Sequence, residues 1–166
     1  MRLNADAAIF EAIWAEALAP LETDAPSVTV LRDYHAENIM LLDDDGQGLI
    51  DYQDALIGHP AYDLVSILQD ARRDVSPDLE VAMLQHYAAT AKPDYDLALH
   101  YALLWAERST KIIGIFTRLW KRDGKERYLD FLPRMWGLLE RDLQHPGLAS
   151  LKSWFDTNIP KAVRST

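Results

Sequence analysis

The sequence predicts an α+β fold in which helix dominates. Short, apolar and partly β-branched segments are confined to residues 28–51, a pattern that is typical of strands. The stretch "DDDGQG" between two of them has the turn chemistry of a hairpin. From residue 60 onward, apolar side chains recur at helical spacing. We therefore expect a small β-hairpin region packed on a bundle of about five or six helices.

The N-terminal segment, about residues 5–19, is predicted to be a helix. Ile9, Ile13 and Leu18 fall near one stripe, and Pro20 follows them. Residues 21–27 then have the composition of a loop.

The β region, about residues 28–51, contains three strand-like segments. They are "VTVL" at 28–31, "NIMLL" at 38–42 and "GLID" at 48–51. The turn between the last two predicts that they form a hairpin.

Residues 61–158 are expected to be helical. Ser76 before Pro77 predicts an N-cap with proline at the first helical position. A long helix follows until "KRDGK" at 121–125 interrupts it, and further helices are expected around 130–144 and 148–158. With no repeat or linker in between, residues 1–166 are interpreted as a single domain.

Composition excludes several classes of function. The net charge is 17 minus 26, or −9, which disfavours nucleic acid and anionic membranes as partners. No run of eighteen apolar residues is present, so we expect no membrane span. Cysteine is absent, which rules out disulfides, thiolate metal sites and a cysteine nucleophile and fits a reducing cytoplasm.

Three oxygen-bearing side chains, Asp33, Asn38 and Asp51, lie at the predicted ends of strands. Asp33 and Asn38 bracket a loop between two strands, and Asp51 ends the hairpin, so we expect them to converge on one point. Hard divalent cations such as Mg²⁺ prefer oxygen ligands of this kind. An aspartate is ionised at neutral pH and can accept a hydrogen bond from a substrate hydroxyl. Such a set suits phosphoryl transfer, in which positioning and charge neutralisation supply most of the catalysis.

The spacing of these residues resembles that of a known group of enzymes. "RDYHAEN" followed by "IDYQDA" has the arrangement of kinase catalytic and metal loops. The longer string, which ends in "GHPAYDLVSIL", resembles the aminoglycoside phosphotransferase and choline kinase group, with its "HGDxHxxN" and "hIDWExAxxGxPxxDLA" patterns. "LRDYHAEN" and "RLWKRDGKERYL" are similar to segments of bacterial cell-wall amino-sugar kinases. The resemblance runs from about Ile9 to Pro160.

This resemblance implies a protein-kinase-like C-terminal lobe that uses ATP and Mg²⁺. In such a lobe, Asp33 would be the catalytic base, and Asn38 and Asp51 would hold the metal. Asp63, in "HPAYDL", would brace the backbone of the catalytic loop. The acceptor would be a small molecule, a sugar or amino sugar. The amino-sugar kinases named above phosphorylate the anomeric hydroxyl of N-acetylmuramate or N-acetylglucosamine in cell-wall recycling.

Four further residues are candidates for binding the acceptor: His35 and Arg32 in the catalytic loop, Arg72 after the first helix of the C-terminal half, and Glu107 on the long helix. Three of them also have a simpler structural explanation, and for His35 it is that of a satisfied loop histidine. Arg72 lies at a helix end, where it complements the helix dipole, and Glu107 has Lys111 four residues later as an ion-pair partner.

The sequence departs from the family pattern in two places. Leu31 replaces the usual histidine two residues before the catalytic aspartate, which implies apolar packing there. The 32 residues before Asp33 contain no glycine and no lysine, whereas the family has a nucleotide-binding lobe with both. We therefore expect a truncated chain, in which the N-terminal lobe is absent or supplied by a separate partner. An exposed apolar patch is expected near "VTVL" and "IMLL", where such a lobe would dock.

Two alternatives to a kinase remain at this stage. The chain could be a non-catalytic, kinase-like binding module that keeps only the acceptor pocket. It could also be a metal phosphohydrolase in which Asp33, His35, Asp51 and His59 hold a metal pair that activates water. Taken one at a time, the Asp and Asn residues are also explained as ordinary turn chemistry.

Overall fold

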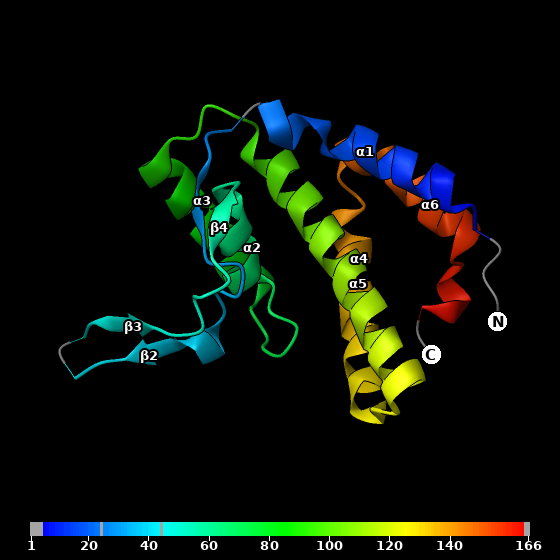
Figure 1. The fold of residues 1–166 in the computed structure, drawn as a ribbon. Coiled ribbons are helices and arrows are strands. Elements are labelled where there is room, and N and C mark those ends of the chain that lie inside the picture. Colours follow the sequence, from blue (N-terminus) through cyan, green and yellow to red (C-terminus); the bar gives the residue numbers. More distant parts are fainter. Residues whose placement is uncertain (1–4, 24, 44, 165–166) are drawn as a thin grey trace. The chain divides into compact units, whose positions relative to one another are not determined.

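The protein is described by a computed structural model, which covers residues 5–23, 25–43 and 45–164. The chain forms two compact units (Figure 1). One, called here the site unit, comprises Asp24–Leu97; the other, the helical unit, comprises Met1–Thr23 and Ala98–Thr166. Each unit is described by itself.

Among the described residues of the site unit, four short strands form two antiparallel pairs. β1 (Val28–Val30) pairs with β4 (Leu56–Gly58), and β2 (Ile39–Leu41) pairs with β3 (Gln47–Leu49). The hairpin predicted around "DDDGQG" is confirmed as β2–β3. β4 was not predicted, and its pairing with β1 gives two separate two-stranded sheets.

Two helices complete the site unit, and a one-turn 3₁₀ helix precedes β2. They are α2 (Ala61–Leu68), α3 (Pro77–Ala91) and η1 (Ala36–Asn38). The predicted cap of α3 is confirmed, because the Ser76 hydroxyl accepts a hydrogen bond from the Leu79 N–H over 3.2 Å. This bond satisfies one of the free N–H groups of the first turn.

The described part of the helical unit contains four α-helices and three short 3₁₀ helices. They are α1 (Ala7–Thr23), α4 (Leu97–Asp123), η2 (Glu126–Phe131), α5 (Leu132–Asp142), η3 (Pro146–Leu148), α6 (Ala149–Asn158) and η4 (Lys161–Val163). α4 begins at the boundary between the units and ends where Gly124 adopts a φ of 65°, as "KRDGK" predicted. The N-terminal helix extends beyond its predicted end, because Pro20 lies in the last turn of α1 and does not terminate it.

Arg164 holds the C-terminal end of the helical unit. Its side chain is 3% exposed and donates to the carboxylates of Glu140 over 3.0 Å and Asp156 over 2.9 Å. It also donates to the backbone carbonyl of Ile159 over 2.6 Å. A buried guanidinium needs such partners for its donors, so Arg164 ties α5, α6 and η4 together.

The architecture is mainly helical with small antiparallel sheets, as the α+β prediction required. Among the residues that the structure describes, no helix has the length and apolar character needed to cross a bilayer.

Candidate functional site

The loop between β1 and β2 carries Asp33 at the surface of the site unit. β1 ends at Val30, which is 2% exposed and anchors the strand. Consecutive turns then shape the backbone: the Asp33 N–H donates to the Leu31 carbonyl over 2.9 Å, and the His35 N–H donates to the Asp33 carbonyl over 3.0 Å. The Asp33 side chain is exposed, so its carboxylate can meet a substrate from solvent.

Asn38 closes this loop with its side chain. Its Nδ2 atom donates to the backbone carbonyl of Asp33 over 2.9 Å and lies 3.4 Å from Nε2 of His35. Because the amide nitrogen bonds to the loop backbone, the amide oxygen is the atom that can accept a hydrogen bond or ligate a cation. The bond also fixes the spacing between the two ends of the D-x-x-x-x-N motif.

Asp51 is held beside Asn38 through the backbone. The N–H of Ile50 donates to the Asn38 carbonyl over 3.1 Å, one residue beyond the β2–β3 ladder. Asp51 follows with a φ of 59°, the left-handed region that is costly for most residues and tolerated by Asp and Asn. The Gln53 amide donates to its Oδ1 atom. The left-handed turn and this contact orient the carboxylate where the hairpin ends.

The donor set suits a hard cation that is shared with a substrate. Within the described residues, no group of three or more His, Cys, Asp or Glu side chains could hold a metal ion by itself. Asn38 and Asp51 instead offer one amide oxygen and one carboxylate. Mg²⁺ is commonly bound by one or two carboxylates together with phosphate oxygens and water, so this sparse set fits Mg²⁺ carried by a nucleotide.

Asp63 connects α2 to the start of the loop. Its Oδ2 atom accepts from the Leu31 N–H over 2.8 Å, and its Oδ1 atom accepts from the Arg32 N–H over 3.0 Å. Arg32 has a φ of 70°, and its carbonyl accepts from the Ser66 hydroxyl over 3.2 Å. Charge-assisted bonds of this kind hold an unfavourable backbone conformation in place. These two bonds join α2 to the backbone immediately before Asp33.

The weaker candidates of the site unit lie around the same loop. Arg32 donates through Nη1 to the Asp54 carbonyl over 3.5 Å. Arg72 pairs with Glu37 of η1, with Nε and Oε2 separated by 3.6 Å. The Nδ1 atom of His35 is buried without a hydrogen-bond partner among the described residues. Asp33, Asn38, Asp51 and Asp63 thus share one unit with these three side chains.

Glu107 lies in the helical unit, in the middle of α4. Burial raises the pKa of its carboxyl above the ordinary value, against the smaller opposing effects of Lys111 and Arg108. The pKa shift means that burial costs free energy when Glu107 is ionised.

Three residues near the site were not singled out from the sequence. Ser66 holds the Arg32 carbonyl, Glu37 pairs with Arg72, and Gln53 contacts Asp51. Ser66 lies three positions after Asp63, so both are on one face of α2, and that spacing is a usable signal. Nothing in the local sequence indicates the partner of Glu37.

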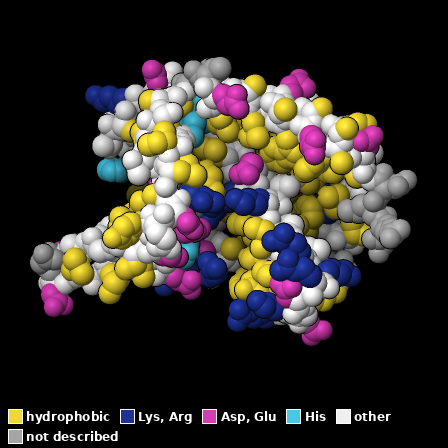
Figure 2. Space-filling model, viewed as in Figure 1, with side chains coloured by type: hydrophobic (Ala, Val, Ile, Leu, Met, Phe, Trp, Pro, Cys, Tyr) yellow, Lys and Arg dark blue, Asp and Glu magenta, His cyan; other side chains and the backbone are white. Residues whose placement is uncertain are grey.

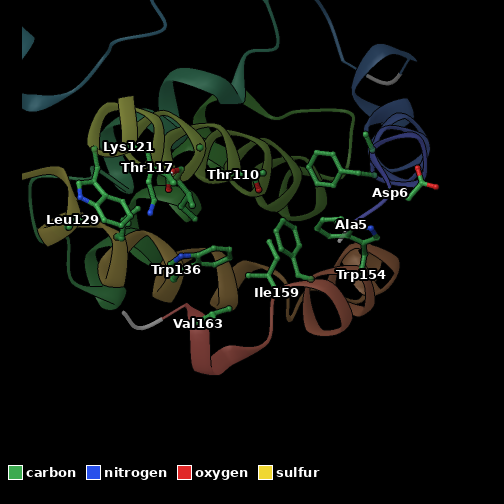
Figure 3. A pocket seen from close by; sticks show the side chains of 17 residues that line it. Ala5, Asp6, Thr110, Thr117, Lys121, Leu129, Trp136, Trp154, Ile159 and Val163 are labelled. Atoms are coloured by element: carbon green, nitrogen blue, oxygen red, sulfur yellow. The ribbon is translucent and has the colours of Figure 1, made fainter. Parts of the chain in front are cut away.

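A separate pocket lies inside the helical unit, with a volume of about 690 Å³. Figure 3 shows aromatic side chains around it, including Trp136 and Trp154, with Thr110, Thr117 and Lys121 from α4. None of the site residues predicted from the sequence lines it. Its apolar aromatic wall differs from the polar surface at Asp33, so the two features have different chemistry.

Comparisons with known proteins identify similar sequences. A model of the phosphotransferase enzyme family matches residues 2–101, which include the whole loop and α2. The N-acetylmuramate/N-acetylglucosamine kinase of Caulobacter vibrioides is 48% identical over 162 residues, which cover 93% of this chain and 44% of that protein. The kinase of the same name from Pseudomonas aeruginosa is 36% identical over 77% of this chain and 40% of that protein. The one from Neisseria meningitidis is 34% identical over 76% of this chain and 40% of that protein.

The chain therefore spans less than half the length of the curated relatives that it matches. More than half of each relative lies outside the matched segment.

Proposed function

The chain belongs to the phosphotransferase enzyme family, and on that premise we propose that it carries the catalytic loop of a small-molecule kinase. The kinase moves the γ-phosphoryl group of ATP to a hydroxyl of a sugar or amino sugar. The observation that carries the proposal is the backbone bond from Ile50 to Asn38. It brings the Asn38 backbone next to Ile50, the residue before Asp51, and so supports a shared role for Asn38 and Asp51 as Mg²⁺ ligands.

Asp33 is the proposed base. Its exposed carboxylate accepts a hydrogen bond from the acceptor hydroxyl and orients that oxygen toward the γ-phosphorus atom of ATP. It takes the proton as the new O–P bond forms and the bond from the γ-phosphorus to the leaving ADP oxygen breaks. The protein takes little covalent part in phosphoryl transfer, so orienting the hydroxyl is the main contribution of Asp33. The loop turns and the Asn38 side chain keep the Asp33 backbone in place for the task.

Asn38 and Asp51 are the proposed ligands of Mg²⁺, through the amide oxygen and the carboxylate. When bound, the ion would neutralise charge on the phosphate oxygens of ATP. The Asn38 amide is oriented for this role because its nitrogen already donates to the Asp33 carbonyl. The Gln53 amide donates a hydrogen bond to one of the two carboxylate oxygens of Asp51 and so orients that carboxylate.

The proposed acceptor is an amino sugar of the kind named for the relatives, N-acetylmuramate or N-acetylglucosamine. We propose that His35, Arg32 and Arg72 contribute to binding it, and that the reaction takes place in the cytoplasm as part of cell-wall recycling. Support for the amino-sugar class comes from the 48% identity to the Caulobacter vibrioides kinase. That identity extends through both units of the chain.

A chimera tests the function directly. The part of the Caulobacter vibrioides kinase outside the matched segment is fused to this chain, and the products made from ATP, Mg²⁺ and N-acetylglucosamine are followed by ³¹P NMR. The proposal predicts a sugar phosphate that appears as ADP forms. Release of inorganic phosphate alone, or no turnover with a panel of amino sugars and sugars, would contradict it and favour a non-catalytic binding module.

A further inference from the structure

The pocket inside the helical unit is elongated along α4. One of its sides is lined by Thr110, Gly114, Thr117 and Lys121 of that helix. Thr110 and Lys121 are eleven residues apart in α4, which corresponds to about 16 Å along the axis at about 1.5 Å per residue. Figure 3 shows Lys121 at one end of the pocket and Trp154 at the other. The volume of about 690 Å³ lies within the range of about 300–1,000 Å³ that is usual for small-molecule sites.

Aromatic rings form much of the pocket wall. Trp136 of α5 and Phe155 of α6 pack edge to face with ring centroids 6.1 Å apart, and the Phe10 ring of α1 lies 4.6 Å from that of Trp154. All four rings line the pocket, together with Trp120 near the end of α4. The three tryptophans are only half-buried. An apolar molecule that covered them would remove further apolar surface from water, which favours binding.

Gly114 keeps the α4 side of the pocket open. A Cβ atom at this position would meet nothing within 4 Å among the described residues, so close packing does not require glycine there. Glycine in the interior of a helix lowers stability relative to alanine, and Gly114 lies well inside the 27-residue α4. The missing side chain leaves space in the pocket in return for this loss of stability.

Lys121 supplies a positive charge at one end of the pocket. Its Nζ atom lies 3.9 Å from the centroid of the Trp120 ring, and no carboxylate of the described residues lies within ion-pair distance of it. The acidic side chain in the lining is Asp6, which Figure 3 shows at the opposite end. Its Oδ1 atom already accepts from the Ala8 N–H over 2.8 Å. The charge of Lys121 is therefore available to a bound anion.

The surface around Lys121 is also positive. Residues 118–127 contain five Lys and Arg and two Asp and Glu, a net charge of 5 minus 2, or +3, in a chain whose net charge is −9. Figure 2 shows Lys and Arg side chains gathered over this end of the helical unit. A local positive field attracts anions. One end of the pocket thus favours an anionic group, whereas the aromatic wall favours an apolar one.

We propose that this pocket binds a chain-like molecule with an apolar body and one terminal carboxylate, of the chemical class of the fatty acids. The carboxylate lies beside Lys121, and the chain extends along α4 past Gly114 toward Trp154. The pocket lies within the helical unit and contains none of the residues proposed for phosphoryl transfer. The proposal therefore does not depend on the proposed kinase function.

Tryptophan fluorescence tests this binding, because three of the five tryptophans line the pocket. The probes are two bromododecanoates, used below the concentration at which they form micelles, since bromine quenches indole fluorescence on contact. Saturable, one-to-one quenching is expected. The probe brominated next to the carboxylate should lose most of its quenching in Trp120→Phe, and the probe brominated at the far end should lose most of it in Trp154→Phe. The reverse pattern would overturn the proposal.

Gly114→Leu fills the pocket and is expected to weaken dodecanoate binding about ten-fold or more, because the leucine side chain occupies the space that the chain needs. Gly137→Leu is the matched control. Gly137 is also a helical glycine whose Cβ would meet nothing within 4 Å, and it does not line the pocket. Leucine is a better helix former than glycine, so both variants should fold, and circular dichroism checks that they do.

Lys121→Met tests the charge. It should weaken dodecanoate binding about three-fold, as expected for a partly exposed ion pair, and leave the binding of dodecanol, which has the same chain without the charge, unchanged. Lys125→Met is the matched control, because Lys125 is an exposed cation in the same segment that does not line the pocket. It should leave the binding of both probes unchanged.

Three further outcomes overturn the proposal. The first is that Gly114→Leu binds dodecanoate as tightly as the wild type. The second is that Lys121→Met and Lys125→Met have the same effect. The third is that the chimera described above does not bind dodecanoate, which would show that polypeptide from the relative fills the pocket. Turnover is not measured in any of these experiments, so a failure here is distinguishable from a failure of the proposed kinase function.

Discussion

The Asp63 carboxylate accepts a hydrogen bond from the Arg32 N–H over 3.0 Å, across 31 positions of the sequence. A second bond, from the Leu31 N–H at 2.8 Å, lies beside it. Arg32 has a left-handed backbone at φ 70°. The pair of bonds therefore couples the first turn of α2 to a strained backbone immediately before Asp33.

Asp63→Ala is expected to lower the free energy of unfolding by about 2 kcal/mol, because backbone donors lose a charged acceptor in a half-buried position. Urea denaturation measures the loss, and hydrogen exchange at the Leu31 and Arg32 amides should speed up. Asp54→Ala is the control, since Asp54 is exposed in the same unit. Equal stability of both variants would show that the contact does not brace the loop.

Arg164→Ala is expected to destabilise the helical unit by about 2 kcal/mol, because Glu140, Asp156 and the Ile159 carbonyl lose a shared, buried donor. Thermal unfolding followed by circular dichroism measures the change. Arg164→Lys should recover only part of it, since an ammonium cannot reproduce the planar fork of guanidinium donors. A melting temperature unchanged in both variants would contradict this account of the C-terminal clamp.

Glu107→Gln is expected to stabilise the protein at neutral pH and to have less effect in acid. Burial raises the pKa of Glu107 above 4.5. The folded state therefore binds this proton more tightly than the unfolded state, and the resulting stability is present below the unfolded pKa and lost as pH rises through the folded one. Glutamine carries no titrating proton, so the variant does not lose this stability as pH rises. Denaturation at pH 4 and pH 7.5 measures the difference in the free energy of unfolding between the variant and the wild type. A stabilisation that does not grow with pH would refute the raised pKa of Glu107.

Asn38→Ala is expected to raise the Mg²⁺ concentration needed for half-maximal turnover of the chimera by on the order of ten-fold, because a proposed metal ligand is removed. A titration of turnover with MgCl₂ measures the shift. Gln53→Ala is the comparison variant, since Gln53 touches Asp51 without being a proposed ligand, and it should shift the curve less. Identical Mg²⁺ dependence in wild type and Asn38→Ala would remove Asn38 from the metal site.

The predicted strands, helices and hairpin follow from local patterns, whereas the pairing of β1 with β4 does not. Ser76 and the hairpin turn were predictable because the signal lies within a few residues. β4 was not predicted, because it pairs with β1, and the two strands are separated in the sequence by the whole β2–β3 hairpin. The pattern predicts that the first helix ends before Pro20, but α1 continues through Pro20 to Thr23.

Some features of the candidate site can be predicted from the local sequence, and others depend on contacts between distant segments. The spacing of Asp33, Asn38 and Asp51 is visible in sequence because one short loop and one hairpin position all three residues. The pairing of Arg72 with Glu37 and the clamp around Arg164 depend on contacts between distant segments, which periodicity does not report. The apolar patch expected near "VTVL" and "IMLL" is confirmed only in part, because Met40, Leu41 and Leu42 are exposed whereas Val30 is buried.

The central claim is that the Asp33 carboxylate orients and deprotonates the acceptor, and steady-state kinetics of Asp33→Asn in the chimera test it most directly. The account predicts that kcat falls by about 100-fold or more, the range for losing a positioned base, while the KM for the amino sugar stays within about three-fold. Asp78→Asn, an exposed substitution on α3 in the same unit, should behave as wild type. A kcat for Asp33→Asn within a few-fold of wild type would contradict the account.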